Sequence, residues 1–171
     1  MNIKQNDDII NMVKSSTKIM EAYKYVIKNN PSNELPYHSI RHILNVFKAA
    51  LNNKYLQKLS QIEVEALFVA ILFHDYSHSG GKSDDTHNVT CAIKEFVSFA
   101  ENYNKQTLSR GYSEYKIDFI YYVIRNIKAT EYPYIIENEY LTFSQGIIRI
   151  SDLLQVVYGN VLTDYILPLY D

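Results

Sequence analysis

Two short segments of the chain bring histidines and a carboxylate close together. The first holds His38 and His42, four residues apart, and the second holds His74, Asp75 and His78 at the end of an apolar run. Burying an imidazole and a carboxylate without partners costs several kcal/mol. A bound cation would satisfy both groups. Imidazole and carboxylate donors suit a divalent ion such as Mn, Fe, Co, Ni, Zn or Mg.

The predicted helices carry these residues toward one another. A helix over 40–51 holds His42, and a helix that begins with the capping-box sequence Ser60-Gln61-Ile62-Glu63 ends at His74 and Asp75. Adjacent helical residues diverge by about 100°. These two residues can therefore share an ion only near the helix end, where the backbone turns away. Gly80 and Gly81 permit that turn.

Apolar residues at helical spacing predict helices along the whole chain. Their approximate ranges are 9–27, 40–51, 60–75, 89–100, 117–127, 147–157 and 161–167. The helix over 147–157 follows a second candidate capping box, Thr142 to Gln145, and places Asp152 among Ile150, Leu153 and Leu154. No strand alternation is evident. We therefore expect an all-α, single-domain bundle of six to seven helices.

The composition argues against nucleic acids and membranes as binding partners. The formal charge is −2, with 17 basic and 19 acidic residues interspersed, so no basic stripe indicates binding to duplex nucleic acid. The longest apolar stretch, Ala66 to Phe73, is far shorter than the roughly 20 residues that span a bilayer. The N-terminus lacks the pattern of a signal peptide, and we expect a cytoplasmic protein that does not bind membranes. Homo-oligomerisation is left open.

The two histidine motifs resemble those of a known superfamily. The segments Tyr37-His38-Ser39-Ile40-Arg41-His42 and Phe73-His74-Asp75-Tyr76-Ser77-His78, with Asp152 on a later helix, are similar to the HD superfamily of metal-dependent phosphohydrolases. More narrowly, they resemble its cyclic-nucleotide phosphodiesterase branch, whose motifs read Y-H-N-x-x-H and H-D-x-x-H. The similarity covers roughly residues 35–158, which implies one HD-type domain over residues 1–171.

The resemblance implies a role for each matching residue. It assigns four ligands to a first metal ion: His42, His74, Asp75 and Asp152. Asp75 would also bridge to a second ion, and His78 would lie near that ion and its water. His38 would donate a proton to the leaving oxygen. The implied reaction is attack of a metal-activated water on a phosphate ester of nucleotide type.

Two further residues are candidate phosphate-binding residues, and two other functions are compatible with the sequence. Arg41 and Lys82 flank the expected site and could hold phosphate oxygens, or they could simply be solvated. Some HD proteins are di-iron oxygenases with similar ligands, which gives a second enzyme class. A non-catalytic metal- or nucleotide-binding HD module is the third possibility. Ser39, where the family has Asn, and the short segment after Asp152 favour that third reading.

Overall fold

Every regular element in the described part of the chain is a helix. The computed structural model describes residues 3–107, 114–134, 136–137 and 140–158. The α-helices are α1 (Ile3–Ser15), α2 (Thr17–Asn29), α3 (Ile40–Leu51), α4 (Gln61–Phe73), α5 (Asp85–Thr107), α6 (Ile117–Lys128) and α7 (Phe143–Tyr158), and 3₁₀ turns cover Pro31–Glu34 and Lys54–Lys58. The predicted all-α fold is confirmed. The predicted helix over 161–167 lies outside the described residues.

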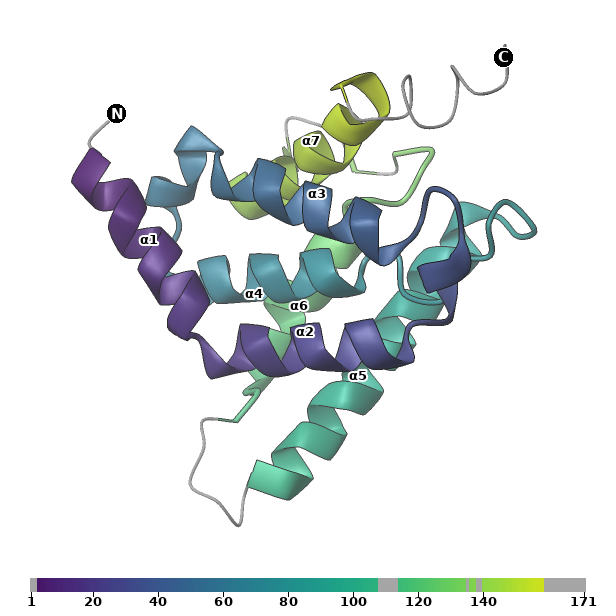
Figure 1. Ribbon diagram of the computed structural model, residues 1–171, viewed down its shortest axis with the longest axis horizontal. Helices are drawn as coiled ribbons and strands as arrows, with labels where there is room; N and C mark the ends of the chain where they lie inside the picture. The colour runs from purple at the N-terminus through teal and green to yellow at the C-terminus, as the bar shows by residue number, and fades with distance from the viewer. Residues whose placement is uncertain (1–2, 108–113, 135, 138–139, 159–171) are drawn as a thin grey trace.

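Helix α4 forms the centre of the bundle. Each residue from Ala66 to Phe73 is completely buried, as expected for a helix that is apolar on all sides. In Figure 1, α4 lies between α2 and α3, and it packs against α6 and α7 as well. The C-terminal end of this central helix carries His74 and Asp75, so the packing of α4 fixes both residues at the edge of the core.

Both predicted capping boxes are confirmed. The backbone N–H of Ser60 donates to Glu63 Oε2 at 2.9 Å, and α4 starts at the next residue. The backbone N–H of Thr142 donates to Gln145 Oε1 at 3.0 Å, and α7 starts at Phe143. These reciprocal bonds satisfy N–H groups that have no partner inside a helix. They fix the start of the two helices that carry His74 and Asp152.

The single helix predicted over 9–27 is wrong, because two helices meet at Ser16. Ser16 is extended, with φ −69° and ψ 115°, and its Oγ accepts the N–H of Ile19 as the N-cap of α2. The same hydroxyl donates to Glu65 on α4 at 2.9 Å. A tertiary contact therefore ends α1 where the apolar spacing continues. Helix α5 also begins earlier than predicted, at Asp85.

The apolar stripe predicted on α7 is wrong for three of its residues. Ile150, Leu153 and Leu154 are exposed, whereas Ile147 and Ile148 are buried in the core. Several polar side chains share the buried face of α7, namely Ser144, Gln145, Arg149 and Ser151. Because polar residues occupy core positions on α7, hydrophobic spacing alone predicted the wrong helix face as the buried one. Helix α7 consequently presents an apolar surface outside the core.

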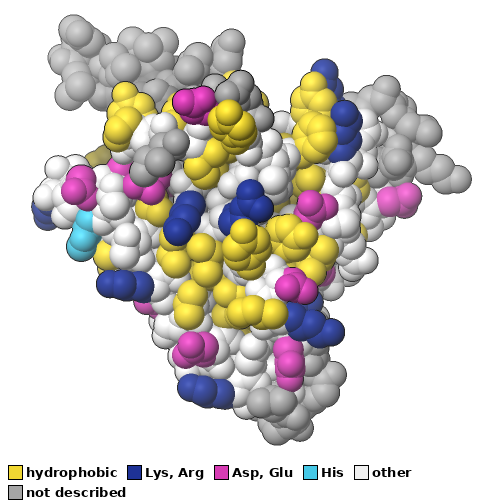
Figure 2. Space-filling view, turned by 180° about the vertical axis from the view of Figure 1, so that it is seen from behind, with side chains coloured by type: hydrophobic (Ala, Val, Ile, Leu, Met, Phe, Trp, Pro, Cys, Tyr) yellow, Lys and Arg dark blue, Asp and Glu magenta, His cyan; other side chains and the backbone are white. Residues whose placement is uncertain are grey.

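The surface carries charges of both signs. Figure 2 shows Lys and Arg side chains interspersed with Asp and Glu around a group of hydrophobic side chains on the face seen from behind.

Among the described residues, no helix is both long enough and apolar enough to span a membrane.

Asn30 ties the loop after α2 to the turn that follows α4. Its Oδ1 accepts the backbone N–H of Ser32 at 3.0 Å and that of Ser77 at 3.1 Å, and the side chain is buried. Ser77 has a positive φ of 60°, in the left-handed region that residues other than glycine seldom adopt. The chain therefore turns away from α4 at Ser77, before Gly80 and Gly81.

We expect Asn30→Ala to lower the free energy of unfolding by about 1–3 kcal/mol, because the substitution leaves two N–H donors without their acceptor. Chemical denaturation measures the change. Asn29→Ala is the matched control, since Asn29 is exposed and, among the described residues, its side chain donates only to the Tyr25 carbonyl. Equal losses of stability in the two variants would contradict this account of the turn.

Candidate metal centre

Four donor atoms from three helical segments meet at the end of α4. The atoms are His42 Nε2 from α3, His74 Nε2 and Asp75 Oδ2 from the end of α4, and Asp152 Oδ1 from α7. Both imidazoles and Asp75 are buried. The structure thus brings together the four residues that the resemblance assigns to a first metal ion. His74 and Asp75 reach the same point although they are adjacent in sequence.

Five of the six separations between these atoms are close to the donor spacing around one ion, and His42, His74 and Asp152 form the group whose donor atoms all lie within 4.8 Å of one another. The five separations are 3.1 Å from His42 Nε2 to Asp152 Oδ1, 3.3 Å from His42 Nε2 to Asp75 Oδ2, 3.4 Å between the two imidazole nitrogens, 3.6 Å from His74 Nε2 to Asp75 Oδ2 and 3.8 Å from His74 Nε2 to Asp152 Oδ1. Donors at about 2.0–2.2 Å from an ion lie about 2.8–3.6 Å apart in octahedral or tetrahedral geometry, and an octahedral ion with four protein donors keeps two positions for water. The donor set and its spacing therefore fit a divalent metal ion.

A backbone contact sets the tautomer of His74. Its Nδ1 lies 2.8 Å from the carbonyl oxygen of Ile71, which can only accept, so Nδ1 carries the proton. In the neutral ring, Nε2 then presents its lone pair toward Asp75 and Asp152. Metal-binding histidines in proteins are commonly held in this way by a hydrogen bond to the other ring nitrogen.

The electrostatics of the cluster favour positive charge. Burial alone would raise the pKa of the Asp75 carboxyl, but His74 and the hydrogen bond from His38 hold that pKa far below its usual range. Burial would likewise raise the pKa of Asp152, yet hydrogen bonds from His42 and His74 lower it to about 2. Burial alone would lower the pKa of His74, but the Asp75 and Asp152 carboxylates outweigh this effect of burial and raise that pKa to about 9. Two carboxylates, the buried Asp75 and the partly exposed Asp152, thus face the point where a cation would bind.

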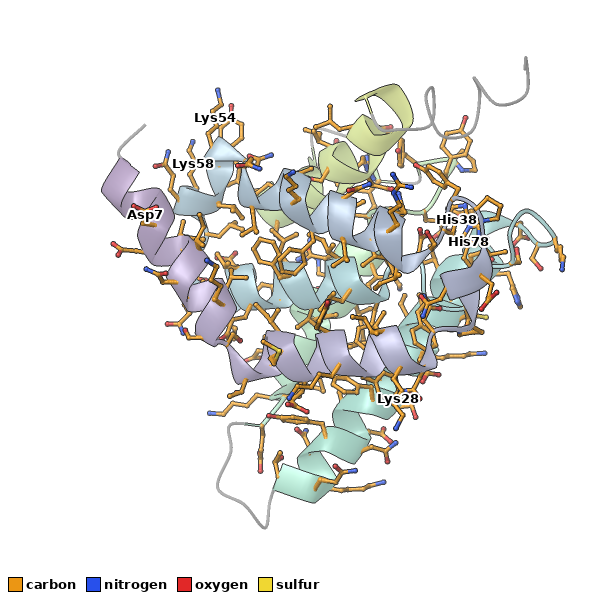
Figure 3. All side chains as sticks on the ribbon, in the orientation of Figure 1. Asp7, Lys28, His38, Lys54, Lys58 and His78 are labelled. Carbon is orange, nitrogen blue, oxygen red and sulfur yellow. The ribbon has the colours of Figure 1, made fainter. Side chains whose placement is uncertain are left out.

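A second cluster shares Asp75 with the first. His38, Asp75 and His78 place one donor atom each within 4.8 Å of one another. His38 Nδ1 lies 2.9 Å from Asp75 Oδ2, and because the carboxylate only accepts, Nδ1 is the donor. The rings of His38 and His78 stack with centroids 3.3 Å apart, and Figure 3 shows the two side chains next to each other. Asp75 therefore joins two histidine-containing groups.

His78 is held in its uncharged form. Its Nδ1 accepts the backbone N–H of Gly80 at 3.0 Å, so this nitrogen carries no proton. Burial and the facing His38 ring lower the pKa of His78. A neutral His78 avoids repulsion between two stacked imidazolium rings.

Asp85 and Asn88 belong to the same region, and no motif in the sequence marks them as functional residues. Asn88 is buried, accepts the N–H of Ser79 at 3.0 Å and places Nδ2 3.1 Å from His78 Nε2. Asp85 Oδ1 lies 3.9 Å from the same nitrogen, and its Oδ2 accepts the N–H of Tyr132 at 2.6 Å. Asp85 therefore ties the start of α5 to the loop that follows α6, and Asn88 holds the backbone of Ser79 next to His78. Only the tertiary fold reveals this, because the two residues lie on a different element from His78.

A cavity of about 370 Å³ opens over both clusters, and we call it the metal cavity. Its wall includes His38, His74, Asp75, His78 and Asp152. Arg41 and Lys82, the predicted phosphate-binding residues, are exposed and lie outside this wall.

Tyr37 also lines the metal cavity. Its hydroxyl is buried and has no hydrogen-bond partner among the described residues. Burial, together with the Asp152 and Asp75 carboxylates, raises the pKa of this phenol, so its O–H remains protonated.

Comparisons with protein-family models, curated proteins and solved structures found no match to this chain.

Metal ions should stabilise the fold. At a free Zn²⁺ concentration about 100 times the dissociation constant, we expect a gain of about 2.7 kcal/mol, because the ion binds only the folded state. Scanning calorimetry with and without chelator measures the change in Tm. Asp152→Ala removes one of the four donors and should show a much smaller rise at the same Zn²⁺ concentration. A rise of equal size in both proteins would contradict binding at this centre.

Proposed function

We propose that this chain is an HD-type, metal-dependent phosphohydrolase that cleaves a phosphate ester of nucleotide type, with water as the nucleophile. The proposal rests on the meeting of His42, His74 and Asp152 at 3.1–3.8 Å, with Asp75 Oδ2 3.3–3.6 Å from both imidazoles and hydrogen-bonded to His38. This combination supplies a site for a cation and a proton donor beside it. Phosphate ester hydrolysis requires both.

The four ligands would hold the ion, and Asp75 is placed to contribute to a second one. A divalent cation bound there would polarise a phosphoryl oxygen and lower the pKa of a water molecule toward neutrality. Asp75 Oδ2 lies within 3.6 Å of both His42 Nε2 and His74 Nε2 and also accepts from His38. The Asp75 and Asp152 carboxylates would offset the charge of the ion. The walls of the metal cavity supply the room for a phosphoryl group.

His38 is the proposed general acid. Its Nδ1–H is committed to Asp75, so Nε2 is the atom that carries the transferable proton. The hydrogen bond to Asp75 fixes the plane of the ring. Donation from Nε2 to the leaving oxygen would avoid expelling an unprotonated alkoxide.

His78 is proposed to position His38 rather than to transfer a proton itself. Its ring lies flat against His38, and the Gly80 N–H and Asn88 surround its two nitrogens. Because His78 is neutral, it limits the rotation of the acid without adding a second positive charge. The proposed catalytic group is therefore His38, with Asp75 and His78 orienting it.

The proposal is tested by hydrolysis of nucleotides. Purified protein is incubated with nucleoside 5′-monophosphates and cyclic mononucleotides, with Mn²⁺ or with EDTA, and the products are separated by ion-exchange chromatography. We expect turnover of at least one of the two ester classes with Mn²⁺ and none with EDTA. Turnover that persists fully in EDTA would overturn the proposal.

The group of His42, His74 and Asp152 and the neighbouring group of His38, Asp75 and His78 also favour one alternative, a di-iron oxygenase, because they offer two adjacent positions for metal. Reconstitution with Fe²⁺ discriminates the two functions. A mixed-valence spectrum with no hydrolysis of any phosphate ester would favour the oxygenase. Hydrolysis supported by Mn²⁺ or Zn²⁺ in the absence of oxygen would favour the phosphohydrolase.

A further inference from the structure

Helix α6 presents an apolar stripe to solvent. Ile117 is 77% exposed and Tyr121 is 57% exposed, and Ile124 on the same face is only partly buried. The other face of α6 enters the core through Phe119 and Val123. Exposed helix faces normally carry polar residues, so the stripe is a candidate contact surface for another molecule.

This stripe lies away from the metal centre. Helix α6 passes behind α4 in Figure 1, so the face of α6 turned away from α4 belongs to the side of the molecule that Figure 2 shows. Hydrophobic side chains gather there among Lys, Arg, Asp and Glu side chains. Within the described residues, the metal cavity is lined by no residue of α6. A partner bound at the stripe therefore does not occupy the metal cavity.

The stripe has the spacing of a helix-pairing seam. Residues 117, 121, 124 and 128 follow one another at intervals of four, three and four, which is the a/d pattern of paired helices. Lys128, the last of them, is exposed, and its aliphatic stem can cover an apolar neighbour while the ammonium group stays in water. The outward face of α6 therefore fits one further helix.

Opposite charges lie on one flank of the stripe. Asp118 is in the first turn of α6 and Arg125 in the last, about 10 Å apart along the axis, so the two cannot pair within one helix. Neither has an ion-pair partner among the described residues. The Arg125 guanidinium lies 5.5 Å from the centroid of the Tyr121 ring, at the edge of the stripe. This flank of α6 thus has an acidic start and a basic end.

A second copy of α6 complements these charges only when it runs in the opposite direction. In a parallel pair, the flank with Asp118 and Arg125 would face the opposite flank of the partner helix, which holds Ile120 and Ile127. In an antiparallel pair, identical flanks face each other. Asp118 of one copy then lies opposite Arg125 of the other, and the two-fold axis repeats the contact. Charge complementarity therefore favours an antiparallel pair.

We propose that two copies of this chain form a homodimer through α6, with the two helices antiparallel about a two-fold axis. Tyr121 packs against Ile124 of the second copy at the centre of the seam, and the exposed Ile117 is covered at each end. The two ion pairs of Asp118 with Arg125 flank the seam. This inference does not depend on the proposed function.

The length of α6 sets the expected strength of the dimer. The helix has 12 residues and is about 18 Å long. A pair of helices this short buries less surface than the roughly 1,200–2,000 Å² of a stable, standard-size interface. We therefore expect a reversible dimer with a dissociation constant of about 1–100 µM.

Sedimentation equilibrium of the purified protein across that concentration range measures the association. We expect the average mass to rise from that of the monomer toward that of the dimer. Tyr121→Glu should weaken the dimer at least about 10-fold, because a central aromatic side chain carries a large share of interface energy. Ile27→Glu is the matched control, since Ile27 is 40% exposed on α2, outside the stripe, and its replacement should leave the dissociation constant unchanged.

Exchange of the two charges tests the direction of the helices. Arg125→Asp places like charges opposite each other twice in the dimer and should weaken association by about 3- to 10-fold. Asp118→Arg should have an effect of the same size. The double variant that carries both substitutions restores opposite charges in an antiparallel pair, so it should regain most of the wild-type affinity.

A monomer throughout the concentration range would overturn the proposal, as would equal weakening by Tyr121→Glu and Ile27→Glu. Failure of the double charge exchange to recover association would overturn the antiparallel arrangement. Circular dichroism and metal content of every variant should match the wild-type protein, because α6 does not line the metal cavity. Ester hydrolysis enters none of these measurements, so the dimer and the proposed function stand or fall separately.

Discussion

Asp75→Ala is expected to abolish metal binding and, with it, all phosphate ester hydrolysis. Asp75 Oδ2 lies 3.3 Å from His42 Nε2 and 3.6 Å from His74 Nε2, and it also accepts from His38. The substitution removes a metal ligand, the link between the two clusters and the group that orients the proposed acid. Metal content after dialysis, measured by inductively coupled plasma spectrometry, should fall from stoichiometric to background.

Asp118→Ala is the matched control for that variant. Asp118 is an exposed carboxylate in the first turn of α6, so its loss should cost about 0.3–1 kcal/mol of stability and leave the metal content unchanged. If Asp75→Ala retained stoichiometric metal, Asp75 would not be a ligand and the proposed centre would be wrong. Circular dichroism distinguishes loss of metal from loss of the fold.

His38→Ala is expected to retain the metal ion while the rate of hydrolysis falls by about 10²–10⁴-fold. His38 is not one of the four donors around the first ion, and its contact with Asp75 uses only Nδ1–H. Removal of the ring should therefore leave the first metal site filled and remove the proton donor. The rate loss should be greatest for esters with poor leaving groups, which depend most on protonation.

His87→Ala serves as the control, because His87 is exposed on α5 and its ring contacts only Cys91 Sγ, at 3.5 Å, among the described residues. This variant should match the wild-type protein in rate and in metal content. If His38→Ala lost metal to the same degree as Asp75→Ala, the division between metal ligand and proton donor would be wrong. An unchanged rate for esters with poor leaving groups would also contradict the role of His38 as the acid.

The sequence predicted the elements whose signals are local. Helix α4 is apolar on every side and begins with a capping box, so its extent and its burial both follow from the residues themselves. The end of such a helix must lie at the edge of the core, which is why His74 and Asp75 were recognisable as a site. The second capping box likewise located the start of α7.

The predictions of helix boundaries and buried faces were wrong where tertiary contacts determine the structure. Ser16 ends α1 because its hydroxyl caps α2 and binds Glu65, a residue 49 positions away. On α7, buried Arg149 takes a core position by binding two carbonyl oxygens, so the apolar residues lie on the other face. No spacing rule anticipates either contact, since each depends on groups brought together only by the fold.

The same limit applied to the candidate site. Histidine and aspartate spacing indicated the metal ligands, because their chemistry requires a partner when buried. Asp85 and Asn88 could not be identified in this way. Each is an ordinary polar residue near a helix start, and each gains significance only from its position beside His78.

The most direct test of the central claim is hydrolysis of bis-p-nitrophenyl phosphate and p-nitrophenyl phosphate as a function of bound metal. Chelated protein is titrated with Mn²⁺, and the release of p-nitrophenolate is recorded together with metal content. We predict no release without metal and a rate that rises with occupancy until the centre is filled. Protein that binds metal stoichiometrically and cleaves neither ester would contradict the account.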